Sequence, residues 1–154
     1  MAIVHLKYNQ IDLEKWDNCI AKSLNSFTFA YSWYLDIVSE AWDALVENDY
    51  QRVMPLIFDF KLNYQFIYNP KLAPQLGIFS TTLLSSEIIK NFIDNIPQKF
   101  KNIEINLNKY NIIEGSNHNL IKNPIYSLDL IQNYEKIYSG YSFDLQKILT
   151  EVVA

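Results

Sequence analysis

The chain has 154 residues, a formal net charge of −4 and a sequence pI near 5.1. Its basic residues are scattered and its only arginine is Arg52, which argues against nucleic acid as a partner, so we expect no DNA binding. Apolar residues make up 49% of the chain, enough for the packed core of a single domain spanning residues 1–154.

Targeting and metal-binding signals are not apparent in the sequence. The segment Met1–Gln10 lacks the apolar core of a signal peptide, and no run approaches the roughly 18 apolar residues that span a membrane. Cys19 is the only cysteine, so an internal disulfide and a zinc cluster are excluded. His5 and His118 form no metal-binding pair. We therefore expect a cytoplasmic protein without a metal.

The N-terminal third predicts a strand followed by two helices. Ile3–Tyr8 is expected to be a short strand at a sheet edge. Asp12 is a favourable helix cap, and apolar residues follow it at helical spacing. Cys19 widens that apolar stripe, so we interpret it as a small core residue rather than a nucleophile. Ser32 is expected to cap the second, shorter helix.

An antiparallel meander is the predicted centre of the fold. Asn48–Asp49 and Leu62–Asn63 fall where hairpin turns are needed, and Asn and Asp tolerate the positive φ of such turns. The middle strand is too apolar to face water, which predicts cover on both faces. Pro55 lies inside it and removes a ladder donor, so it marks either a bulge or a splayed strand. The three strands are Trp42–Glu47, Gln51–Phe60 and Tyr64–Tyr68.

The second half of the chain predicts further strands and helices. Pro97 is expected to end the helix after the meander, and Gly140 to divide the last helix into two. The remaining expected elements are a helix starting at Ser85–Glu87, an alternating strand Ile103–Asn108, a hairpin segment Tyr110–Glu114 with its turn at Gly115–Asn117, a strand Ile125–Leu130 and a helix from about Asn133.

Three places are candidates for a binding site, and each has a structural alternative. Tyr31–Tyr34 sets aromatic rings and a hydroxyl at a helix start, where free amides favour an anionic or carbonyl ligand, or else it anchors the core. Gln75–Gly77 either permits close backbone approach or forms a simple turn. Asn106 and Asn108 share the polar face of the expected strand, where they either contact a peptide-like ligand or satisfy a neighbouring loop.

The order strand, two helices, meander, helix, strand, strand and helix matches the N-acetyltransferase-like (GNAT) fold, which is a mixed, mostly antiparallel sheet with helices on both faces. Four stretches resemble the N-terminal half of FemAB-like proteins, which are tandem GNAT-like proteins related to the aminoacyltransferases that build peptidoglycan cross-bridges. These stretches are Tyr31–Asp36, Val53–Leu56, Gln75–Ser80 and Ile103–Asn108.

The resemblance implies an acyl- or aminoacyltransferase-like domain. In such chemistry an amine acceptor, small or peptide-like, attacks an activated donor, which is an acyl-CoA or an aminoacyl-tRNA. Tyr31, Asp36 and Lys61 lie in or beside the matching stretches, but no residue is singled out as the catalytic base. The candidate substrate-binding residues are Tyr31, Ser32, Tyr34, Asp36, Lys61, Gln75, Asn106 and Asn108.

The chain departs from the resemblance in two respects. Gly77, Gly115 and Gly140 are isolated, so the glycine-rich turn that holds the CoA pyrophosphate is missing, and we expect no cofactor and no usual CoA binding by this chain alone. The chain also ends where a second half is expected. This predicts a domain that is inactive alone and a homodimer formed through the last helix. The alternatives are a non-catalytic binding or assembly module and a truncated product of a longer gene.

Overall fold

The computed structural model describes residues 2–61, 64–115, 119–125 and 131–153. It divides the chain into two compact units, Met1–His118 and Asn119–Ala154, which are described separately. The first unit contains β1 (Ile3–Leu6), η1 (Tyr8–Gln10), α1 (Leu13–Lys22), η2 (Thr28–Ala30), α2 (Ser32–Val38), β2 (Trp42–Glu47), β3 (Arg52–Lys61), β4 (Tyr64–Ile67), β5 (Phe79–Ser80), α3 (Ser86–Asp94) and β6 (Phe100–Ile103), and the second contains α4 (Tyr134–Ser139) and α5 (Phe143–Val153).

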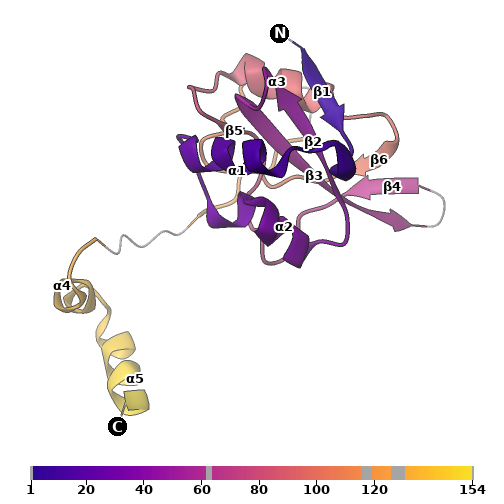
Figure 1. Ribbon diagram of the computed structural model, residues 1–154. Coiled ribbons are helices and arrows are strands. Elements are labelled where there is room, and N and C mark those ends of the chain that lie inside the picture. The colour runs from indigo at the N-terminus through magenta and orange to yellow at the C-terminus, as the bar shows by residue number, and fades with distance from the viewer. Residues whose placement is uncertain (1, 62–63, 116–118, 126–130, 154) are drawn as a thin grey trace. The chain divides into compact units, whose positions relative to one another are not determined.

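The described strands of the first unit form one open, mostly antiparallel sheet (Figure 1). The strand order is β1-β2-β3-β4-β6, and β5 pairs with β3. Successive strands from β1 to β4 are antiparallel, whereas β6 runs parallel to β4. The sequence-based predictions of an α+β fold and of an edge position for β1 are confirmed.

The β2–β3 hairpin turns at the predicted residues. Asn48 and Asp49 have φ values of 48° and 52°, and Tyr50 follows with 68°, so three successive residues adopt left-handed backbone. Asn and Asp accept this conformation more readily than other side chains do. The turn sets the register that pairs Glu47 with Arg52. The second predicted turn, Leu62–Asn63, lies outside the described residues.

Strand β2 and residues 52–58 of β3 are buried on both faces, as their apolar content predicts, whereas the last three residues of β3 are exposed. Alternate residues pack into two core clusters, because successive side chains of a strand point to opposite faces. On one face Ala44 and Val53 join Trp16 of α1, and on the other Met54 joins Phe92 of α3. Figure 1 shows α1 and α2 together on one side of the sheet. Each large side chain buried here stabilises the fold by about 1.5–3 kcal/mol.

Pro55 marks a splayed stretch of β3 rather than a bulge. On the β2 side it lies opposite Ala44 in an unshifted register. On its other side β3 pairs with β5 only at Arg52–Val53 and with β4 only at Phe58–Lys61. Among the described strands, none pairs with residues 54–57 on that side. Proline suits such a position because it has no N–H to donate.

Of the two predicted helix caps, Asp12 is confirmed and Ser32 is wrong, and α3 begins where the sequence predicts a helix start. Asp12 caps α1 and Ser85 caps α3, each by accepting a backbone N–H three residues on. The prediction that Ser32 caps α2 is wrong, because Tyr31 occupies the cap position. Ser32 instead directs its N–H and its hydroxyl to the carboxylate of Asp17, at 2.8 Å each. A carboxylate is a stronger acceptor than a neutral group, which explains the change.

The predicted strand Ile103–Asn108 is wrong beyond its first residue. β6 ends at Ile103, and the chain then leaves the sheet. The N–H of Asn106 donates to Oδ1 of Asn69 at 2.8 Å. Leu107 forms only an isolated bridge, and together with Ile105 it packs against the second core cluster. The apolar alternation therefore arises from a loop that covers the core, with a side-chain amide in place of a strand partner.

The predicted hairpin segment Tyr110–Glu114 is also wrong, because these residues form no strand. The N–H of Asn111 donates to the Asn108 carbonyl, and the N–H of Glu114 donates to the hydroxyl of Ser86. Partners outside any strand thus satisfy this backbone. The predicted turn at 115–117 and the predicted strand 125–130 lie mostly outside the described residues.

The described part of the second unit contains two helices, α4 and α5, that Gly140 separates, as predicted. Asn133 caps α4, and Gly140 terminates it. No side chain of α4 is buried. In α5 the apolar side chains of Phe143, Leu145 and Ile148 are 79%, 41% and 55% exposed. Within the described ranges, neither unit has a helix of the length and apolar character needed to cross a bilayer.

Candidate functional site

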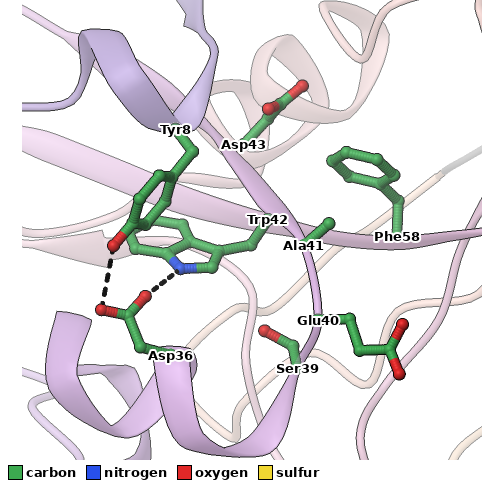
Figure 2. A pocket seen from close by; sticks show the side chains of 8 residues that line it. All are labelled: Tyr8, Asp36, Ser39, Glu40, Ala41, Trp42, Asp43 and Phe58. Carbon is green, nitrogen blue, oxygen red and sulfur yellow. Dashed lines mark hydrogen bonds between the residues drawn. The ribbon is translucent and has the colours of Figure 1, made fainter.

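A cavity of about 410 Å³ opens beside the first residues of β2, and we take it as the candidate site (Figure 2). Its walls come from η1, α2, the α2–β2 connection, β2 and β3. Three carboxylates and no basic side chain are among the lining residues. These residues are Tyr8, Asp36, Ser39, Glu40, Ala41, Trp42, Asp43 and Phe58.

Asp36 is fixed in the wall by two neutral donors (Figure 2). The Tyr8 hydroxyl donates to its Oδ2 at 3.0 Å, and the Trp42 indole N–H donates to its Oδ1 at 2.9 Å. The Trp42 ring is 2% exposed and packs against Trp16, so the indole is rigidly held. The hydrogen bond to Asp36, with burial and the charge of that carboxylate, raises the pKa of Tyr8. Tyr8 therefore remains a donor at neutral pH.

Asp43 is a second carboxylate of the wall, and it is paired with the Lys99 ammonium and the His5 ring. Its Oδ2 accepts from His5 Nε2 and from Lys99 Nζ, at 2.8 Å each. The Lys99 ammonium also lies 5.3 Å from the centre of the Phe58 ring and 4.6 Å from that of Phe100. An ammonium group is thus already held between a carboxylate and two aromatic rings, an environment that favours organic cations.

A second cavity of about 630 Å³ adjoins the first and shares Asp36, Ser39 and Glu40 with it. Asp59 and Tyr68 lie in its wall. Burial, followed by the negative charges of Asp59 and Glu40, raises the pKa of Tyr68. The acidic character of the site therefore extends into the second cavity.

Asp36 is the one sequence-predicted residue that lines the cavities. Tyr31 is half-buried and packs against the first core cluster, and Ser32 is buried on Asp17. The Tyr34 hydroxyl donates to a backbone carbonyl of the loop after β4. These three side chains therefore anchor α2 and the loop. This outcome agrees with the alternative in which Tyr31–Tyr34 serves the packing of the core and not the binding of a ligand.

The other predicted residues lie in separate places. Lys61 is exposed at the end of β3, and Asn106 is exposed in the loop after β6. The Oε1 of Gln75 is buried and has no hydrogen bond within the described residues. Asn108 is 2% exposed, and its amide donates to the Leu76 carbonyl at 2.9 Å. Asn108 thus satisfies the neighbouring loop.

Sequence reasoning missed most of the residues that build the site. Tyr8, Trp42 and Asp43, with His5 and Lys99 behind them, come from parts of the chain far apart in sequence. One signal was present: Asp43 follows the start of a strand that is otherwise largely apolar, and a buried carboxylate requires partners. The residues that pair with Asp43 follow no recognisable pattern in the sequence.

No group of three or more His, Cys, Asp or Glu side chains within the described ranges is arranged to hold a metal ion. No protein-family model matches the chain, and no curated protein and no solved structure matches it. The resemblance to FemAB-like proteins stays a prediction.

Proposed function

We propose that this chain is an acyltransferase-like domain with a GNAT-like sheet, corresponding to the acceptor-side half of a FemAB-type enzyme. The observation that carries the proposal is the interrupted pairing of β3, which leaves residues 54–56 without a backbone partner among the described residues on the side facing β5 and β4, whereas the Ile57 carbonyl accepts from the N–H of Tyr68. The parallel pairing of β4 with β6 after the intervening helix α3 supports it further. An extended acyl donor can bond to free strand peptide groups as an added strand does.

The chemistry proposed is attack of an amine on the carbonyl carbon of the donor. A C–N bond forms, the C–S or C–O bond to the donor breaks, and backbone N–H groups stabilise the oxyanion. The acidic cavity beside β2 is the proposed place of the acceptor, because it offers carboxylates and a hydroxyl without competing basic side chains in its wall.

The positions of the glycines support a mode of donor binding that does not use the usual glycine-rich turn for the pyrophosphate. Gly77 has a φ of +91°, and a Cβ there would overlap Oδ1 of Asn111, so this glycine is required for internal packing. Gly115 has a φ of +57° and open space around it, but no second glycine stands beside it. The donor would therefore bind in another manner or with another chain.

The test is transfer of a radiolabelled acyl group to a diamine by the full chain, with acetyl-CoA and an aminoacyl-tRNA offered as separate donors. We expect transfer from one donor above the heat-denatured control, and calorimetric binding of that donor. Absence of transfer and of donor binding would overturn the proposal. It would favour the binding or assembly module, for which the acidic cavity is then the candidate binding site.

A further inference from the structure

The outward face of α2 is apolar, although a helix at the surface of a domain normally turns polar side chains to the water. The inward residue Leu35 is buried in the first core cluster. Trp33 and Ile37 lie one turn apart on the opposite face, and they are 51% and 75% exposed. This row of two large apolar side chains is therefore without a cover among the described residues.

The apolar surface continues from α2 onto the loop after β4. The ring of Tyr34 lies 5.5 Å from that of Trp33, centre to centre, and its hydroxyl donates to the carbonyl of Leu72. The side chain of Leu72 is 69% exposed. Ile37 also lines the second cavity, together with Tyr68. Exposed apolar side chains gathered in one place mark an interaction surface, and we call Trp33, Tyr34, Ile37 and Leu72 the α2 patch.

The charges beside the α2 patch are mostly negative. Glu40 and Asp59 line the second cavity with Ile37, and both are exposed. Figure 2 shows the Glu40 carboxylate directed away from the first cavity. Among the described residues 32–40 and 68–74, Lys71 is the one basic side chain. The apolar side chains require a cover, and these charges decide which kind of cover fits them.

We propose that the α2 patch docks a basic amphipathic helix of another protein. The apolar face of that helix covers Trp33 and Ile37, and its lysine or arginine side chains lie beside Glu40 and Asp59. Helices that dock in this way insert a few apolar side chains into a groove, and the second cavity beside Ile37 provides room for them. Complementary charges at the rim add specificity and speed association.

A second copy of this chain fits the α2 patch poorly. It brings the same carboxylates and a net charge of −4 to the contact, so that like charges would meet. A basic partner removes that repulsion. Docking does not require acyl transfer, so the inference goes beyond the proposed function and does not depend on it.

The test is titration of the full chain with a designed helical peptide of leucine and lysine whose leucines share one face. NMR follows the indole N–H signals of Trp33, in the patch, and of Trp16, which is buried. We expect a saturating shift of the Trp33 signal and an unchanged Trp16 signal. A peptide of the same composition with scattered leucines, and one with glutamate in place of lysine, should give no saturating shift. Equal responses to the three peptides would overturn the proposal.

Variants locate the contact. Ile37→Ser removes an exposed apolar side chain and should weaken peptide binding about tenfold. Ile112→Ser makes the same change at a side chain that is 65% exposed, in the segment beside α3 across the sheet, and should leave binding unchanged. Glu40→Gln should weaken binding about threefold at low salt, whereas Glu114→Gln, in that same segment, should not.

The substituted side chains are exposed, so the variants keep the fold, which an unchanged amide spectrum verifies. Equal losses at the two isoleucines, or no loss at either, would contradict the proposal. Association of the full chain that Ile37→Ser abolishes would identify a second copy as the occupant and would also overturn it. No acyl donor is present, so failure here is distinct from failure of acyl transfer.

Discussion

At the scale of single residues, Gly77 is required by both its backbone and its surroundings. Its φ of +91° is unfavourable for any residue with a Cβ. An added Cβ would overlap Oδ1 of Asn111 and lie 2.8 Å from a methyl group of Leu107. Asn111 would then lose its hydrogen bond from the Ile78 N–H, at 2.7 Å. We predict that Gly77→Ala lowers the free energy of unfolding by about 3 kcal/mol, measured by urea denaturation.

Gly115 provides the matched control for that substitution. It also has a positive φ, +57°, but the nearest atom to an added Cβ is Lys90 Nζ at 4.0 Å. Gly115→Ala therefore tests the backbone conformation without a clash, and we expect a loss of about 1 kcal/mol. Equal losses at the two positions would show that the contact with Asn111 contributes nothing.

Cys19 makes stability depend on pH in the alkaline range. Burial raises the pKa of its thiol to about 11, and the hydrogen bond with Ser23 only partly opposes this. The unfolded chain, with a lower pKa, loses the thiol proton first as the pH rises. The stabilising contribution is therefore complete below about pH 9 and is lost progressively between pH 9 and 11.

The measurement compares urea midpoints of the natural chain and Cys19→Ala between pH 8 and 10.5. The tyrosines with raised pKa values, such as Tyr8, also lower the stability of both proteins as the pH rises through this range. Because this loss is common to the two proteins, the difference between their curves isolates the thiol. We predict that the natural chain's advantage over the variant shrinks by an amount on the order of 1–2 kcal/mol. A difference that is constant with pH would contradict a buried, protonated Cys19.

Residue-level expectations from sequence succeeded where the cause is local. Asp12 caps its helix as predicted because the hydrogen bond closes within three residues, and the predicted helix start at Ser85–Glu87 has the same local cause in the Ser85 cap. Asp36 was found through a family-like stretch, but the hydrogen bonds that fix it come from Tyr8 and Trp42. Such partners depend on how distant segments pack, and one sequence carries no signal of that packing.

At the scale of elements, periodicity predicted the strands and helices that bury a regular face. The β2–β3 hairpin has both an apolar pattern and turn residues that accept positive φ, and the two agree. Ile103–Asn108 shows the limit, because its alternation fits a strand or a loop lying on the core. There the amide of Asn69 and the backbone of Leu76 supply the partners that a strand would need.

Splaying of β3 is the element-scale feature on which the proposed function depends. Pro55 indicated an interruption in the sequence but left two alternatives, a bulge, which is the commoner case, and a splayed strand. The unshifted register with β2 decides between them, because a bulge would displace that pairing. The interruption lies on the side facing β4 and β5, where the Ile57 carbonyl accepts from the N–H of Tyr68 and Pro55 has no N–H to donate.

At the scale of the whole molecule, the two units differ in how they are stabilised. Both core clusters consist of residues between Ile3 and Ile113, all of them in the first unit. In the second unit, α4 buries no side chain and α5 exposes Phe143, Ile148 and Val152. Two short helices whose described side chains belong to no core cluster gain little stability from propensity alone. The apolar side chains of α5 are therefore the expected contact of a homodimer.

We predict that the full chain is a dimer at micromolar concentration and that a chain ending at residue 118 is a monomer. The free energy of unfolding of each folded subunit should differ between the two chains by no more than about 1 kcal/mol. Light scattering gives the mass and urea denaturation gives the stability. Ile148→Ser should weaken the dimer, whereas Lys147→Ser, at its exposed polar neighbour, should not. A monomeric full chain would contradict the dimer. A shortened chain that remains dimeric would place the interface in the first unit, because apolar side chains of α5 would then be absent while association persists.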